Sequence, residues 1–341
     1  MPSNPQSPIN TLAISALSPE IVTIKTIEDL QKLNLITNSE YYVLGEGSNV
    51  LFTEPKTPKI LRPLIKGIEI EEAENCFLLN VGAGENWHEL VKFTIERDMP
   101  GLENLALIPG SVGAAPVQNI GAYGVEFSDF CCSVNWYNFG KKKIETFNKH
   151  ACLYGYRNSV FKGNLKGKGI IVSVKIVIPK KWTAKLNYAG LNTLHKNVTP
   201  SEVMAKVIEI RESKLPNPNE LANAGSFFKN PVVAHEQFTQ LIAKFPNIPN
   251  YPQANETVKL AAGWLIEQAG FKGFKIGDAG VHKDQALVLV NYGSASGRDM
   301  IKLAKLIIEK ITEKFGINLE PEVRLVDQSG ECTIEELIEN V

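Results

Sequence analysis

The chain has 341 residues, of which 44% are apolar and 21% are charged. Single hydrophobic cores rarely exceed roughly 250–300 residues, so this composition predicts two or three domains and excludes a largely disordered chain. The 36 basic and 37 acidic side chains give a net charge of −1, which excludes a general attraction to nucleic acid or membrane surfaces.

Cysteine and histidine usage predicts a reduced protein without a metal site. The five cysteines include no Cys-x-x-Cys pair, and no two of the five histidines have metal-ligand spacing. The polar residues 1–9 do not resemble a signal peptide, and no apolar run is long enough to span a bilayer. We therefore expect a cytoplasmic protein with no membrane, nucleic-acid or protein partner implied.

The first 100 residues alternate predicted strands with two helices. Thr26 precedes Asp29 by three residues, which is a capping-box pattern, and Leu90, Val91 and Ile95 keep helical spacing. The predicted strands cover residues 21–24, 41–44, 50–53 and 77–81, and the predicted helices cover residues 26–33 and 87–97.

A glycine turn, residues 45–49 (GEGSN), joins two of these strands. Successive backbone N–H groups in such a turn form an anion site, and glycine lets a phosphate approach closely. A plain hairpin turn has the same composition. No complete Gly-x-Gly-x-x-Gly sequence occurs, which argues against a Rossmann-type nucleotide site.

Residues 109–124 (PGSVGAAPVQNIGAYG) are rich in glycine and alanine and have no clean period. Side chains this small cannot fill a core, but they leave room for a large ligand such as a flavin or a diphosphate. Long structureless stretches in compact domains are usually functional, and the alternative is a glycine-rich loop between strands.

An arginine with aromatic neighbours follows in Tyr154-Gly155-Tyr156-Arg157. Aromatic side chains can hold a guanidinium rigidly for bidentate binding of a carboxylate. The alternative is a surface arginine stacked on a tyrosine. Beyond it, residues 169–178 predict a buried strand, and Thr199-Pro200-Ser201-Glu202 predicts a helix start, with the helix running to about residue 211.

Residues 214–223, with two prolines and three asparagines, predict a linker and the main domain boundary. The elements expected after it are a helix over residues 259–269 closed by Gly270, a strand over residues 285–291, a helix capped by Ser296 and Asp299 and ending near Gly316, and a solvated acidic helix after Asp327.

Two short segments in this half carry polar residues in unusual settings. Ser226 lies among small residues before two phenylalanines, with no Gly-x-Ser-x-Gly elbow, so it fits a hydroxyl proton donor better than a hydrolase nucleophile; the alternative is a turn or N-cap serine. Pro321 between Glu320 and Glu322 predicts an extended path with both carboxylates on one side, or else an edge strand with solvated charges.

Taken together and in order, these motifs closely resemble those of the UDP-N-acetylenolpyruvoylglucosamine reductase family, over about residues 10–326. The segments that carry the resemblance are GEGSN at 45–49, IPGSVGAAPVQNIGAYG at 108–124, YRNSVFK at 156–162, GSFFKNP at 225–231, LAAGWLIEQAG at 260–270 and LEPEVR at 319–324.

The resemblance implies an α+β fold, with a two-part FAD-binding region of the vanillyl-alcohol-oxidase type and a third, substrate-binding α+β domain. The expected domains are residues 1–66, 67–215 and 216–320, with residues 321–341 returning to the FAD-binding region. It also implies that NADPH reduces non-covalently bound FAD, which then reduces the enolpyruvyl ether of a UDP-sugar. Tyr251 matches the substrate-closing tyrosine loop of the longer family type.

The resemblance also implies roles for individual residues. Hydride addition to an enol ether needs charge to flow into the attached carboxylate, so the site must stabilise a dianion. Arg157 and Glu322 match the residues with that task, and Ser226 matches the proton donor. The implied flavin-binding residues are Gly45, Glu46, Gly47, Ser48, Asn49, Val50, Pro109, Gly110, Ser111, Gly113, Ala114, Gly121, Tyr123, Gly124 and Arg324. The implied substrate-binding residues are Tyr188, Lys214, Asn230, Tyr251, Lys272 and Gln285.

Two other functions compete with this interpretation. An FAD-linked alcohol or lactone oxidase would share the fold class, and many such enzymes attach FAD covalently through His or Cys, but neither residue occurs in residues 45–49 or 109–124. A UDP-sugar-binding protein without flavin is the other, and the two glycine-rich segments argue against it.

Overall fold

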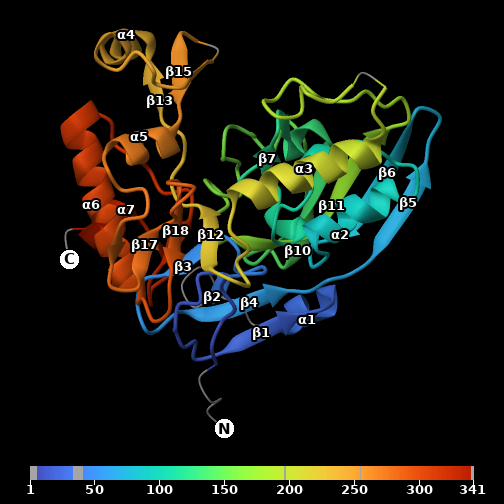
Figure 1. Ribbon diagram of the computed structural model, residues 1–341. Helices are drawn as coiled ribbons and strands as arrows, with labels where there is room; N and C mark the ends of the chain where they lie inside the picture. The colour runs from blue at the N-terminus through green and yellow to red at the C-terminus, as the bar shows by residue number, and fades with distance from the viewer. Residues whose placement is uncertain (1–5, 34–40, 196, 254, 339–341) are drawn as a thin grey trace. The chain divides into compact units, whose positions relative to one another are not determined.

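The computed structural model describes residues 6–33, 41–195, 197–253 and 255–338. The chain divides into two compact units, which are described separately (Figure 1). The first unit contains Pro19–Gly47 and Pro58–Ser213, and the second contains Ser7–Ser18, Ser48–Thr57 and Lys214–Val341. The division therefore falls inside the glycine turn, between Gly47 and Ser48, and again at the predicted linker.

The first unit is built on two sheets. A parallel sheet has the order β1-β4-β2, and a larger antiparallel sheet has the order β10-β9-β11-β6-β5. The strands are β1 (Ile21–Ile24), β2 (Tyr41–Val43), β4 (Lys59–Pro63), β5 (Ile68–Glu72), β6 (Cys76–Gly82), β7 (Gly121–Ala122), β8 (Val125–Glu126), β9 (Cys131–Asn138), β10 (Lys143–Asn148) and β11 (Gly169–Pro179). The helices are α1 (Ile27–Lys32), α2 (Trp87–Ile95) and α3 (Pro200–Lys214), with short 3₁₀ turns η1 (Glu103–Leu105), η2 (Val112–Ala114) and η3 (Phe127–Asp129).

Strand β11 is apolar along its length because its side chains enter two cores. Val174 and Ile176 belong to a cluster that includes residues of α2 and α3, whereas Ile170 and Val172 pack with Leu61 and other residues of the parallel sheet region. Figure 1 shows α2 and α3 lying over the larger sheet. This two-sided burial explains why most of residues 169–178, other than Ser173 and Lys175, are apolar instead of alternating with polar residues.

The second unit joins segments from both ends of the chain. The strands are β3 (Val50–Phe52), β12 (Ala222–Ser226), β13 (Val232–Ala234), β14 (Asn250–Pro252), β15 (Thr257–Leu260), β16 (Lys275–Ile276), β17 (Ala279–Val281), β18 (Val288–Asn291), β19 (Arg324–Val326) and β20 (Glu331–Cys332). The helices are α4 (His235–Lys244), α5 (Ala262–Gln268), α6 (Gly297–Phe315) and α7 (Ile334–Ile338), and α6 contacts both α5 and α7. The sheets have the orders β12-β18-β17-β16, β13-β15-β14 and β20-β19-β3.

Several predicted elements differ from the structure in their bounds or in their strand pairing. Residues 259–260 belong to β15, so α5 begins only at Ala262, and the strand predicted from residue 285 begins at Val288. The acidic segment after Asp327 is not simply a solvated helix, because Glu331 and Cys332 pair with β19 before α7 begins. Helix α3 extends to Lys214, which shortens the predicted linker. The chain also bends at Glu322 and Val323 rather than continuing in an extended path.

Candidate functional site

The first half of the glycine turn faces Ser111 in the first unit. A Cβ added to Gly45 would lie 3.0 Å from Ser111 Oγ, so no larger residue fits there without displacing the serine. That Oγ is buried and has no hydrogen-bond partner among the described residues. Glu46 accepts hydrogen bonds from Asn86 Nδ2 at 3.0 and 3.1 Å, which ties the turn to the N-cap of α2. The space beside Gly45 and the Ser111 hydroxyl, which lacks a partner among the described residues, fit a ligand with polar atoms such as FAD.

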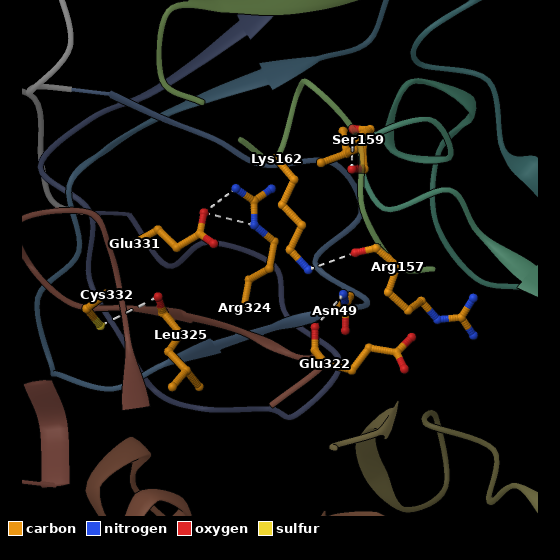
Figure 2. A network of polar contacts seen from close by, with 10 residues as sticks. Asn49, Arg157, Ser159, Lys162, Glu322, Arg324, Leu325, Glu331 and Cys332 are labelled. Atoms are coloured by element: carbon orange, nitrogen blue, oxygen red, sulfur yellow. Dashed lines mark hydrogen bonds and ion pairs between the residues drawn. The ribbon is translucent and has the colours of Figure 1, made fainter. Parts of the chain in front are cut away.

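The second half of the turn is held by the C-terminal segment of the second unit. Val50 pairs with Arg324 where β3 runs parallel to β19, and the Arg324 N–H donates to the Asn49 carbonyl at 3.2 Å. Asn49 Nδ2 in turn donates to the Glu322 carbonyl at 3.3 Å (Figure 2). The turn is therefore not a plain hairpin, because its two flanking strands belong to different sheets.

Residues 109–124 form a compact set of turns in the first unit. Gly113 in η2 approaches Ala83 so closely that a Cβ would lie 2.6 Å from the Ala83 side chain. Pro109 and Gly110 precede this turn, and Ala114 ends η2. Tyr123 and Gly124 link β7, which begins at Gly121, to β8 with φ values of 51° and 79°, as a type I′ hairpin turn requires. The segment is thus a series of ordered turns, and whether it binds a ligand or only links strands stays a prediction.

Arg157 occupies a strained position in a tight turn of the first unit. Gly155 and Asn158 exchange two backbone hydrogen bonds of 3.1 Å, and Arg157 between them has a φ of 52°. Non-glycine residues rarely adopt this conformation, and such strain clusters at functional sites. The side chain donates from Nη2 to the Gly121 carbonyl at 3.1 Å, and its guanidinium lies 5.5 Å from the Tyr156 ring. The contact with Tyr156 fits both alternatives, so the carboxylate-binding role stays a prediction.

Tyr188 lies beside the glycine-rich segment. Its ring meets the Tyr123 ring edge-on at 5.1 Å, so a predicted substrate residue and a predicted flavin residue are in contact within the first unit. Burial raises the pKa of the Tyr123 phenol, which therefore stays protonated at neutral pH.

Ser226 ends a strand that is bent by a bulge. The register of β12 against β18 shifts between Asn223 and Ser226, and Gly225 has a φ of 71°. A glycine in this conformation re-aims the residue that follows it, and bulges are frequent beside active sites. Two buried phenylalanines come next and pack on each other at 5.0 Å, which fixes the chain beyond the serine. Ser226 is therefore not a helix N-cap.

Glu322 is brought next to this strand by the backbone of the second unit. Its N–H donates to the Phe227 carbonyl at 2.7 Å, so Glu322 is hydrogen-bonded to the residue after Ser226. Glu320, by contrast, forms an ion pair with Lys229 at 2.7 Å. The second unit therefore gathers Ser226, Glu322 and Asn49, whereas Arg157 belongs to the first unit.

Arg324 is engaged by a residue that the sequence did not single out. Glu331 of β20 accepts hydrogen bonds from the Arg324 Nε, at 3.0 Å, and from its Nη2, as Figure 2 shows. The two side chains are only 21% and 12% exposed. This ion pair fixes the guanidinium on β19, which pairs with β3, the strand that follows the glycine turn. The flavin-binding role of Arg324 stays a prediction.

Replacing Glu331 with glutamine is expected to lower the free energy of unfolding by about 1–3 kcal/mol, because it leaves a largely buried guanidinium without its anion. Denaturant unfolding followed by tryptophan fluorescence measures this. Glu335→Gln, an exposed neighbour with the same charge change, is the control. Equal stability of both variants would contradict a structural role for the Arg324–Glu331 pair.

Three of the other predicted substrate residues of the second unit form polar contacts within the protein. Asn230 Oδ1 accepts the Ala262 N–H at 3.0 Å and so caps α5, and Lys272 pairs with Glu267 at 2.9 Å. Gln285 lies in the turn before β18, and its N–H donates to His282. Lys214 is exposed at the end of α3. Their substrate roles stay predictions.

Tyr251 lies on a strand rather than in an irregular loop. It belongs to β14, is paired with Lys259 of β15, and is 50% exposed. The Lys259 ammonium lies 6.0 Å from the ring. Sequence reasoning missed this lysine because the pairing of β14 with β15 has no local signature.

In the described part of the chain, no helix is long and apolar enough to cross a bilayer. No group of three or more His, Cys, Asp or Glu side chains there is arranged to hold a metal ion.

Two regions of the chain match models of protein families. An FAD binding domain model matches residues 19–141, and a UDP-N-acetylenolpyruvoylglucosamine reductase C-terminal domain model matches residues 217–326. The chain is therefore an α+β protein with an FAD-binding domain.

Similarity to individual proteins extends over nearly the whole chain. UDP-N-acetylenolpyruvoylglucosamine reductase of Shewanella sp. (strain MR-4) is 48% identical, covering 96% of this chain and 97% of that protein. The reductase of Escherichia coli (strain K12) is 46% identical, covering 97% and 98%. The crystal structure of the Thermus caldophilus reductase has a TM-score of 0.65 at 23% identity, covering 95% of this chain and 99% of that one, and shows the same fold. The chain belongs to the UDP-N-acetylenolpyruvoylglucosamine reductase family.

Proposed function

We propose that the protein reduces UDP-N-acetylglucosamine enolpyruvate to UDP-N-acetylmuramate with NADPH as the electron donor. The observation that carries this proposal is 48% identity to a reductase of that name over 96% of the chain. The reaction belongs to peptidoglycan precursor synthesis in the cytoplasm, which serves cell-wall formation, cell shape and division. The substrate is a small UDP-sugar, and no other partner is needed.

Several residues of the first unit fit FAD. Gly45 and the unpaired Ser111 hydroxyl form a cradle beside η2, and neither residues 45–49 nor 109–124 contain a His or Cys for covalent attachment. Bound FAD would accept hydride from NADPH and deliver it to the enolpyruvyl double bond. The flavin-binding residues, and a division into parts at residues 66, 215 and 320, remain part of this proposal.

The chain's own residues supply the remaining chemistry. Arg157, pre-positioned by its turn, would bind the substrate carboxylate and stabilise the negative charge that develops there. Ser226, aimed by the bulge at Gly225, would deliver a proton to the carbon that becomes the lactyl stereocentre. Glu322, whose backbone N–H binds the Phe227 carbonyl, would in its protonated form help Arg157 to stabilise the dianion. A serine hydroxyl is a weak acid, so nearby positive charge must stabilise the alkoxide that remains.

The test is spectroscopic. Protein purified under mild conditions should be yellow, lose its colour with NADPH, and regain it with the enolpyruvyl substrate but not with simple alcohols. Denaturation should release the colour. Because no separate Rossmann site is evident in the sequence, NADPH and substrate should share one cleft and give parallel double-reciprocal lines. A colourless protein, or reoxidation by alcohols or lactones instead, would overturn the proposal.

Tyr251→Phe is expected to raise the KM for the enolpyruvyl substrate about tenfold, because an exposed hydroxyl on β14 that donates to the substrate is lost. Flavin reduction by NADPH should be unchanged. Tyr292→Phe is the matched control, since Tyr292 also lies beside a lysine, with Lys275 3.4 Å from its ring. Equal damage to both half-reactions would mean that β14 supports the fold and not the ligand.

A further inference from the structure

The start of helix α2 is hydrogen-bonded to the stretch of chain that leads into the glycine-rich segment. Trp87 donates from its backbone N–H to the Gly110 carbonyl at 2.9 Å, and from Nε1 to the Leu105 carbonyl at 3.0 Å. His88, the next residue of the helix, accepts the Leu107 N–H at Nδ1, at a distance of 3.0 Å. Two consecutive residues of α2 thus bind this stretch at three points ahead of η2.

The Leu107 backbone depends on such support because it is strained. Its φ is 57°, in the left-handed region that residues with a side chain rarely adopt. A conformation of this kind persists only where the surrounding structure stabilises it. His88 supplies the acceptor for the Leu107 N–H, and this hydrogen bond therefore helps to set the direction in which the chain enters Pro109 and Gly110.

This hydrogen bond requires a neutral imidazole. Nδ1 accepts only while it carries no proton, and a protonated His88 would place two donors face to face. Burial lowers the pKa of His88, the charge of Glu89 opposes this change, and the positive charges of Lys92 and Arg211 add to it. The hydrogen bond is therefore present above the ordinary histidine pKa of about 6.5, and it is lost as the pH falls through the lowered value.

The other charged groups near this contact already have partners or lie outside the bound stretch. Glu89 and Lys92, both on α2, pair with each other at 3.1 Å. Glu103 belongs to η1, which contacts α2, and its carboxylate accepts hydrogen bonds from two N–H groups. Residues 105–113 contain no ionisable side chain. Protonation of His88 is therefore the change that mild acid makes at this contact.

We infer that His88 is a positioning residue for the flavin: its neutral form keeps the Leu107 backbone, and with it the turns over residues 109–113, in the arrangement that retains FAD, and its protonation weakens this retention. This inference rests on the proposed flavin site in residues 109–124. By linkage, bound FAD in turn disfavours protonation of His88.

Two substitutions separate the acceptor of His88 from its ability to take up a proton. Asn Oδ1 is the same number of bonds from Cα as His Nδ1, so His88→Asn keeps an acceptor that does not titrate. His88→Ala removes the acceptor. At about pH 8, His88→Ala should weaken FAD binding by about 10- to 100-fold, the scale for an unsatisfied backbone group, whereas His88→Asn should stay within about threefold of the wild type.

The pH profile distinguishes this role from a merely structural one. As the pH falls from about 8 to about 5, the dissociation constant of FAD should rise about tenfold more for the wild type than for His88→Asn. Protonation of FAD itself affects both proteins alike and cancels in the comparison. Serial dilution of the full-length, FAD-loaded protein, followed by the rise of flavin fluorescence, measures the dissociation constant without measuring turnover.

His150→Ala is the matched control, because His150 is an exposed histidine of the same unit. It should change neither the dissociation constant of FAD nor its pH profile. Equal FAD affinity of His88→Ala and the wild type, or equal pH profiles of the wild type and His88→Asn, would overturn the inference. If His88→Ala does not fold, the comparison of those two pH profiles still decides. A wild-type protein that binds no FAD would instead overturn the proposed function.

Discussion

Replacing Ser226 with alanine is expected to slow reoxidation of the reduced flavin by the enolpyruvyl substrate by about a hundredfold or more, the scale for losing a general acid. In the proposed reaction, the serine would deliver its proton only after hydride has reached the substrate. Reduction of the flavin by NADPH should therefore stay within about twofold of the wild type. Stopped-flow absorbance measures the two half-reactions separately.

The position of Ser226 makes this a clean substitution. It ends β12 after the bulge, is followed by buried Phe227, and loses only a hydroxyl in the variant. Ser294→Ala, at an exposed position of the same unit, is the control and should leave both half-reactions unchanged. If Ser226→Ala slowed both half-reactions equally, the serine would support the bulge, and the assignment as proton donor would be wrong.

Arg157→Ala is expected to slow the same half-reaction by about 10²- to 10³-fold, the scale for removing one preorganised donor to developing negative charge. It should also weaken binding of the enolpyruvyl substrate, because in the proposed reaction the arginine would contact the carboxylate before hydride transfer as well. Arg157→Lys should recover only part of both effects, since an ammonium lacks the bidentate fork.

Arg97→Ala controls for loss of one positive charge, because Arg97 is exposed in the same unit with its guanidinium 3.8 Å from the Phe93 ring. The thermal midpoint of Arg157→Ala should lie only slightly below that of the wild type, because the Gly155–Asn158 backbone pair keeps the turn while the side-chain hydrogen bond to the Gly121 carbonyl is lost. If Arg157→Ala bound the substrate normally but reoxidised the flavin slowly, Arg157 would stabilise the transition state and not the bound substrate.

Local signals in the sequence predicted helices best. The box formed by Ser296 and Asp299 and the left-handed Gly316 define both ends of α6, and the Thr26–Asp29 box starts α1 as expected. These signals depend on residues within one turn of the helix end, so the sequence contains them in full.

Pairings between strands could not be predicted in this way, even where the two strands follow one another in the chain. The Arg324–Glu331 ion pair depends on β20 folding back on β19, and Tyr251 faces Lys259 because β14 pairs with β15. The separation of Gly47 from Ser48 into two units likewise follows from pairing with residues near the other end of the chain. The candidate site residues were recognisable by resemblance to the family, but the residues that contact them, such as Glu331 and Lys259, were not. The hydrophobic periodicity of a segment indicates which of its faces is buried, but not which other segment packs against that face.

The parallel pairing of β3 with β19 also sets an order of folding. Asn49 and Glu322 are 273 residues apart. At a synthesis rate of about 5–20 residues per second, β3 leaves the ribosome on the order of tens of seconds before its partner strand exists. The strand after the glycine turn therefore acquires its hydrogen bonds only when the polypeptide is nearly finished. Until then the backbone groups of β3 lack their native partners, and we expect closure of this long-range pair to be a late step of folding.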